Sequence, residues 1–157
     1  MVMLKPKLDI LPPEQKNVWP KLIEIPDNFV LYGGTAIALR LGHRESVDFD
    51  FFTHKNFDPS DLFNKIPFLK DAQITQQEQS TLSVELQQSG FENIVNLSFF
   101  GVNLPQIKEP AIIKENGIKV ASLIDLFGMK CATIYQRAET KDYIDIDAII
   151  SSGVDIN

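Results

Sequence analysis

The sequence contains a single cysteine, Cys131, and therefore cannot form a disulfide within the chain. A lack of disulfides is typical of a reducing compartment, so we expect a cytoplasmic location, with Cys131 packed in the core. No apolar run reaches the roughly 20 residues that a membrane-spanning helix requires. Residues 1–6 show neither the apolar segment nor the cleavage site of a signal peptide. The sequence therefore predicts no membrane partner.

Positive charge is also scarce, because 15 Lys and Arg residues stand against 21 Asp and Glu residues, a net charge of −6. Such a chain has no general attraction for the phosphates of DNA or RNA, which disfavours a nucleic-acid-binding module. Five basic residues, however, lie within two short stretches that also carry motifs: Arg40, Arg44, Lys130, Arg137 and Lys141. A triphosphate site needs such a local concentration of positive charge.

The length of 157 residues suffices for one hydrophobic core and is short for two. We therefore expect one domain over residues 1–157, with an α+β fold in which helices flank a small mixed β-sheet. Residues 1–28 are predicted to form an N-terminal helical cover, and residues 29–100 the core of the sheet. Residues 103–116 are predicted to be an extended connection, and residues 117–151 a strand and two helices.

The most informative stretch begins with an apolar run, residues 29–32, that ends at Gly33-Gly34-Thr35 and is followed by a helical pattern. Paired glycines between a strand and a helix let the backbone approach a ligand closely. The N–H groups at the start of the helix favour an anion such as a phosphate. We expect the Thr35 hydroxyl to cap the helix or to bind the ligand.

Twelve residues separate Thr35 from Asp48, and from Ser46 to Phe52 the chain alternates as a strand does, which places Ser46, Asp48 and Asp50 on one face. Two carboxylates so close together repel each other unless a cation lies between them. Hard oxygen ligands suit Mg²⁺ or Mn²⁺, which also bridge substrate phosphates. A solvated strand face is the alternative, but the neighbouring phenylalanines indicate a buried strand, where unpaired acids are costly. We interpret Asp48 and Asp50 as metal ligands.

The helix predicted for residues 122–137 has a capping-box-like start and carries Lys130 in the middle of an apolar stripe. A lysine in that position either extends its amine to water or meets an anion. In the last predicted helix, Asp142 and Asp145 border another apolar stripe. Asp142 suits the helix dipole, and Asp145 could pair with a nearby cation, Lys141 or Arg137.

Together these motifs resemble those of a known group of enzymes. The turn at residues 33–35 and the Asp-Phe-Asp at residues 48–50 resemble the signature of the DNA-polymerase-beta-type nucleotidyltransferase superfamily. Residues 39–52 resemble, more narrowly, the AbiEii/AbiGii toxins of bacterial toxin–antitoxin and phage-defence systems. Residues 117–130 and 141–146 resemble the later lysine and aspartate segment of that group, so the resemblance covers most of the chain.

The resemblance implies a nucleotidyltransferase-like fold and transfer of a nucleotidyl group from an NTP to an RNA (tRNA-like) or protein acceptor, with an antitoxin protein as partner. It implies that Mg²⁺ or Mn²⁺ is held by Asp48 and Asp50. The nucleotide-binding residues would be Gly33, Gly34, Thr35, Arg44 and Ser46, and the catalytic residues Asp48, Asp50, Lys130, Asp142 and Asp145. On the residues alone, Arg44 and its neighbour His43 are equally well explained as solvated turn residues.

One position departs from the superfamily pattern. A neighbouring strand usually supplies a third carboxylate, where this chain has Asn96 and Ser98. An amide and a hydroxyl bind Mg²⁺ more weakly than a carboxylate does. Glu85 on the next strand, or else Asp142 or Asp145, would have to replace it. The alternative prediction is a catalytically impaired nucleotide- or partner-binding protein on the same fold.

Overall fold

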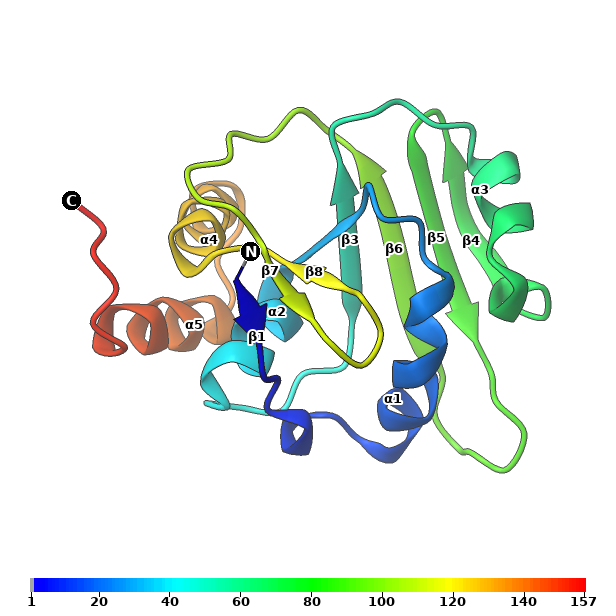
Figure 1. The fold of residues 1–157 in the computed structure, drawn as a ribbon, viewed down its shortest axis with the longest axis horizontal. Coiled ribbons are helices and arrows are strands. Elements are labelled where there is room, and N and C mark those ends of the chain that lie inside the picture. The colour runs from blue at the N-terminus through cyan, green and yellow to red at the C-terminus, as the bar shows by residue number, and fades with distance from the viewer. Residues whose placement is uncertain (1) are drawn as a thin grey trace.

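Eight strands form one mixed β-sheet in the computed structural model, which describes residues 2–157 (Figure 1). Their order across the sheet is β1-β7-β8-β2-β3-β6-β5-β4. The strands are β1 (Met3–Leu4), β2 (Val30–Tyr32), β3 (Phe49–Thr53), β4 (Gln73–Glu78), β5 (Thr81–Leu86), β6 (Val95–Gly101), β7 (Ala111–Ile113) and β8 (Lys119–Val120). The sheet confirms the predicted α+β class, although it is larger than the small sheet we expected.

Strand β3, which carries Asp50, lies near the middle of the sheet. It runs antiparallel to β2 and parallel to β6. In this register Asp50 lies between Tyr32 on one side and Ser98 on the other. The ladder begins only at Phe49, so Asp48 lies in the extended segment that leads into the strand.

Five α-helices accompany the sheet: α1 (Pro13–Val18), α2 (Gly33–Leu41), α3 (Pro59–Lys65), α4 (Leu123–Gln136) and α5 (Thr140–Ser151). Short 3₁₀ helices span Leu8–Ile10, Trp19–Glu24 and Pro67–Leu69. Helices α1 and α3 lie over the half of the sheet that ends in β4, whereas α2, α4 and α5 contact one another near the other half (Figure 1). Within the described chain, no helix is both long and apolar enough to cross a lipid bilayer.

The boundaries of the helices follow from local hydrogen bonds. The Ser122 hydroxyl accepts the Asp125 N–H at the start of α4, and Glu139 with Asp142 forms a capping box at the start of α5. At the end of α2, Gly42 adopts the left-handed conformation, with φ of 66°. These signals are short-range, which is why the sequence predicted the start of α4.

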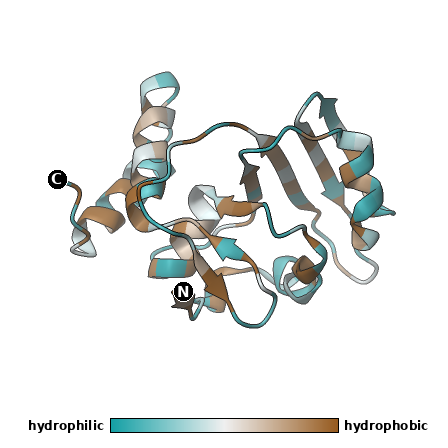
Figure 2. Ribbon diagram, turned by 45° about the horizontal axis from the view of Figure 1, so that its top comes forward, coloured by the Kyte–Doolittle hydropathy of each residue, from teal (hydrophilic) through white to brown (hydrophobic). Residues whose placement is uncertain are grey.

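The hydrophobic core joins buried residues of the sheet to buried residues of α2 and of the short 3₁₀ helices, with single buried residues from α1, α3, α4 and α5. Along β3, β5 and β6, buried apolar residues alternate with more exposed ones, and the strands are accordingly striped in Figure 2. Phe51 stacks on Phe99 with ring centroids 5.4 Å apart, and Phe29 packs edge-on against Phe99. The opposite faces of these strands carry the polar side chains, including Asp50.

Two expectations about the fold were wrong, and one of the two roles predicted for Thr35 is excluded. The segment 103–116 is not only a connection, because it contains strand β7, and β7 pairs with the unpredicted strand β1. Cys131 is exposed on α4 instead of packed in the core, because the buried face of that helix passes through Leu126 and Lys130. Thr35 is not an N-cap, because α2 already begins at Gly33 and no side chain caps it.

Candidate active site

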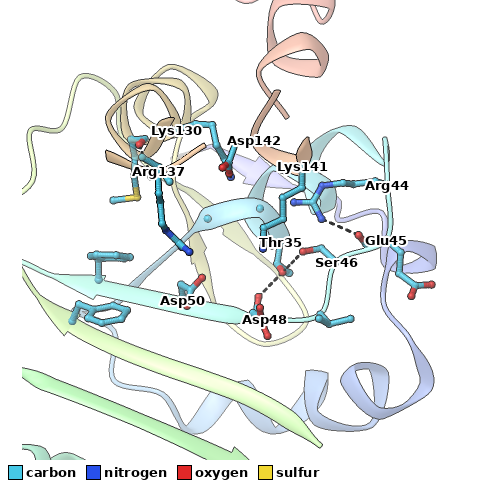
Figure 3. A pocket seen from close by; sticks show the side chains of 17 residues that line it. Thr35, Arg44, Glu45, Ser46, Asp48, Asp50, Lys130, Arg137, Lys141 and Asp142 are labelled. Atoms are coloured by element: carbon cyan, nitrogen blue, oxygen red, sulfur yellow. Dashed lines mark hydrogen bonds and ion pairs between the residues drawn. The ribbon is translucent and has the colours of Figure 1, made fainter. Parts of the chain in front are cut away.

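A cleft of about 450 Å³ lies between the polar face of the sheet and helices α4 and α5 (Figure 3). Of the ten predicted site residues, all except Asp145 line this cleft. The lining comprises Gly33, Gly34, Thr35, Arg44, Glu45, Ser46, Val47, Asp48, Asp50, Phe52, Phe100, Met129, Lys130, Thr133, Arg137, Lys141 and Asp142. The structure thus brings together two parts of the sequence that lie about 80 residues apart.

The glycine turn packs too closely against acidic and basic side chains to carry a side chain of its own. A β carbon on Gly33, which has φ of 80°, would lie 3.0 Å from Oδ2 of Asp50. A β carbon on Gly34 would lie 2.2 Å from a terminal nitrogen of Arg44. Because no side chain caps α2, the N–H groups of its first turn remain available to an anion in the cleft.

Thr35 and Ser46 hold the segment before β3 against the helix. The buried Thr35 hydroxyl donates to the backbone carbonyl of Asp48. Its single proton is then used, so in their 2.7 Å hydrogen bond Ser46 donates to Thr35. These contacts fix the position of Asp48 relative to the glycine turn.

Asp48 and Asp50 both line the cleft, Asp50 from strand β3 and Asp48 from the segment before it (Figure 3). Burial and the nearby negative charge of Asp48 raise the pKa of Asp50 to about 6, although Lys141, Lys130 and Arg137 act in the opposite direction. Asp48 accepts a 3.3 Å hydrogen bond from the Asn96 amide. The acidic pair is therefore only partly compensated by the protein itself.

Asp145 lies behind the cleft as the centre of an ion-pair cluster. Arg44 contacts both of its carboxylate oxygens, at 2.7 and 2.9 Å, and His43 and Lys130 contact one each, at 2.7 and 3.0 Å. Burial pushes the pKa of Asp145 upward, but the hydrogen bonds from Arg44, His43 and Lys130 lower it to about 2. The expected pairing of Asp145 with Lys141 or Arg137 was wrong, since both of these contact Glu139.

Lys130 forms ion pairs with two carboxylates of its own chain. Its buried ammonium group lies 3.0 Å from Asp142 and 3.0 Å from Asp145. Asp142 also accepts the Glu139 N–H at the start of α5, and its pKa falls because that hydrogen bond and Lys130 outweigh the effect of burial. Asp142 thus serves the helix terminus, as one prediction had it, and also orients Lys130.

The donor set suits a divalent cation that binds together with phosphates. Within residues 2–157, no three His, Cys, Asp or Glu side chains are grouped as a metal site. Four acids line the cleft: Glu45, Asp48, Asp50 and Asp142. Glu45 is exposed and Asp142 is paired with Lys130, which leaves Asp48 and Asp50 as the candidate ligands. Mg²⁺ is often held by only one or two carboxylates, with water and substrate phosphates as the other ligands. The mutual repulsion of Asp48 and Asp50 and the anion-binding turn beside them fit this arrangement.

Sequence reasoning did not single out several residues of the cleft. Arg137 and Lys141 had been noted only for their charge, and the phenylalanines Phe52 and Phe100 only for their alternation. Of the five clustered cations, Arg40 lies elsewhere, because it donates to the carbonyls of Val120 and Ala121. Glu85 does not line the cleft either and faces Asn96 across β5 and β6.

Comparison with known proteins agrees with the motifs. A family model described as the nucleotidyl transferase AbiEii toxin of type IV toxin–antitoxin systems matches residues 22–157. The chain belongs to the AbiEii family. The uncharacterized protein aq_aa25 of Aquifex aeolicus (strain VF5) is 34% identical over 137 residues, which are 85% of this AbiEii-family chain and 64% of that relative.

Two crystal structures from Helicobacter pylori share the fold of this AbiEii-family chain. JHP933 superposes with a TM-score of 0.66 and 22% identity, over 85% of this chain and 62% of that one. A protein provisionally described as a nucleotidyltransferase superposes with a TM-score of 0.64 and 20% identity, over 83% of this chain and 64% of that one. The AbiEii-family chain spans less than two thirds of each of these three proteins.

Proposed function

We propose that this chain is a Mg²⁺- or Mn²⁺-dependent nucleotidyltransferase, the cytoplasmic toxin of a toxin–antitoxin or phage-defence system that also includes an antitoxin protein. It would move a nucleotidyl group from an NTP to an RNA, such as a tRNA, or to a protein. The observation that best supports this function is the contact between the glycine turn and Asp50, in a cleft that also contains Asp48 and several cations.

In the proposed reaction, the oxygen of an acceptor hydroxyl attacks the α-phosphorus and its proton passes to water. The bond from that phosphorus to the oxygen leading to the β-phosphate breaks, and pyrophosphate leaves. The N–H groups at the start of α2 would hold phosphate oxygens, while Lys130, Arg137 and Lys141 offset their charge. Asp48 and Asp50 would hold the metal, which when bound stabilises the charge on the phosphates.

We assign Asp145 a positioning role, because both of its oxygens already accept hydrogen bonds from Arg44. It would hold Arg44 beside the glycine turn and, with Asp142, hold Lys130 at the edge of the cleft. A buried, fully paired carboxylate is poorly suited to bind a metal as well.

A second candidate function is nucleotide binding without turnover. The observation that favours it is the pair of residues on β6, because Asn96 and Ser98 lie beside Asp48 and Asp50 where a third acid would be expected. The two functions differ in whether a nucleotidyl group is transferred.

One experiment tests both candidate functions: the purified protein is incubated with Mg²⁺, total RNA and NTPs that are labelled at the α-phosphate. We expect label to enter RNA or protein, to be lost in Asp48→Asn and Asp50→Asn, and to persist in Asp71→Asn, which changes an exposed aspartate far from the cleft. Binding of NTP without transfer would support the second candidate. Undiminished transfer by both cleft variants would place the chemistry elsewhere.

A further inference from the structure

Beyond Asp50 the cleft has an aromatic floor and is also lined by Met129 and Thr133 of α4 and by Arg137 at the end of that helix, and the transfer chemistry makes no use of that floor. Phe52 follows Asp50 by two residues on β3, and Phe100 follows Ser98 by two residues on β6, so both rings lie on the face that carries the aspartates. Both are partly exposed to the cleft, and Met129 of α4 lines it with them. An aromatic surface thus faces the cleft, although Phe52 also packs against the hydrophobic core.

The two rings form one floor. Phe52 and Phe100 are cross-strand neighbours whose ring centroids lie 5.0 Å apart at an interplanar angle of 31°. Behind them, the buried Tyr32 packs edge-on against Phe52, with centroids 5.3 Å apart. These contacts fix the ring planes, and a fixed aromatic plane suits a flat ligand.

The polarity of the cleft gives a nucleotide one direction of binding. Towards Asp48 the walls are polar, with Thr35, Ser46 and Arg44 around the glycine turn. In the other direction, Phe52 lies about 6.6 Å along the strand from Asp50, at roughly 3.3 Å per residue. A nucleotide with phosphates at the turn would therefore extend its ribose and base over the phenylalanines.

We propose that Phe52 and Phe100 form the floor of a nucleobase site, on which the base of the bound NTP stacks, with Met129 contributing to the walls. This inference depends on the proposed function, because it takes the phosphates to lie at the glycine turn. None of these three side chains has a strong hydrogen-bonding group, so the floor recognises the flat face of a base and does not itself select one base over another.

The test compares the α,β-methylene analogue of ATP with the α,β-methylene analogue of ribose 5-triphosphate, which has no base. The affinity of the protein for each ligand is measured by calorimetry in the presence of Mg²⁺. We expect the wild-type protein to bind the ATP analogue about five- to 150-fold more tightly, the range that stacking on aromatic residues provides. Phe52→Leu and Phe100→Leu keep the apolar volume but remove the flat ring, and should each reduce that ratio at least fivefold without changing the affinity for the ribose 5-triphosphate analogue.

The matched control is Phe63→Leu on α3, a partly buried phenylalanine outside the cleft, which should bind both ligands as the wild-type protein does. Equal affinity of the wild-type protein for the two ligands would overturn the nucleobase site and leave the proposed function intact, and this comparison needs no variant. Failure of both ligands to bind would instead refute the proposed function. If the leucine variants raise the KM for acceptor RNA but bind the ATP analogue normally, the rings hold an acceptor base, and the proposal for the NTP base is wrong.

Discussion

Oδ2 of Asp50 lies 3.0 Å from the position that a β carbon on Gly33 would occupy. Gly33 also has a left-handed backbone, so a side chain there would be strained and would collide with the carboxylate. The acid and the turn therefore keep a fixed spacing, with an anion-binding backbone directly beside a carboxylate.

Asp50→Asn should stabilise the metal-free protein. Burial and the charge of Asp48 raise the pKa of Asp50 to about 6, so ionisation of this group opposes folding at neutral pH. We expect a gain on the order of 1–3 kcal/mol in the free energy of unfolding at pH 8, shrinking as the pH falls through 6 and absent near pH 4. Urea unfolding in EDTA at pH 8 and at pH 4 measures this gain, and a loss of stability at pH 8 would contradict the prediction.

Gly34→Ala should lower both the stability of the protein and its affinity for nucleotides. The added methyl group would lie 2.2 Å from Arg44, which must then release Asp145 and leave a buried carboxylate short of partners. We expect a loss of about 2–4 kcal/mol, measured by urea unfolding. Gly128→Ala is the control, because its methyl group meets open space on helix α4, and it should gain about 0.5–1 kcal/mol.

The stability that Asp145 confers should disappear in acid. Its pKa of about 2 lies below the ordinary value of 3.8, so its contribution is complete above pH 4 and is lost as the pH falls towards 2. The difference in unfolding free energy between the wild-type protein and Asp145→Asn should shrink by on the order of 2 kcal/mol across that interval. A difference that is independent of pH would show that the hydrogen bonds around Asp145 do not depend on its charge.

Lys130→Met and Lys141→Met should separate stability from ligand binding. Lys130 is buried between Asp142 and Asp145, whereas the Lys141 side chain is 53% exposed. We expect Lys130→Met to lose about 3–5 kcal/mol of stability along with nucleotide affinity, because two buried acids lose a partner. Lys141→Met should lose affinity while its thermal midpoint stays within about a degree of wild type. Equal destabilisation of the two variants would rule out this distinction.

Asn96→Asp should strengthen metal binding. The new carboxylate would stand beside Asp48, with which the Asn96 amide now forms a hydrogen bond, and would repel it in the absence of a cation. We therefore expect a lower melting temperature in EDTA and a larger rise on addition of Mg²⁺ than in the wild-type protein. Asn64→Asp, on the exposed side of α3, should change neither quantity by a comparable amount. A Mg²⁺ response equal to that of the wild type would place the cation away from Asp48.

The sequence predicted the parts of the site that depend on neighbours along the chain. Alternation around Asp48 and Asp50, the paired glycines and the start of α4 are all short-range patterns, and the structure has them in place. The partners of Asp145 could not be predicted in this way. Arg44 lies 101 residues away in the sequence, and only the packing of α5 against α2 brings the two together.

The missed strands have a similar explanation. Strands β1 and β7 have two and three residues, too few for alternation to stand out, and they pair across more than 100 residues of sequence. Exposure of Cys131 was missed for a different reason. A helix with apolar residues on several sides does not reveal from its sequence which side its neighbours cover, and on α4 the covered side includes a lysine.

The ion-pair cluster around Asp145 has a consequence for biosynthesis. Arg44 is synthesised 101 residues before Asp145, and a nascent chain that has not yet reached α5 has no carboxylate to hold Arg44 against the glycine turn. The cluster is therefore completed only after residues 140–151 have emerged from the ribosome and docked against α2.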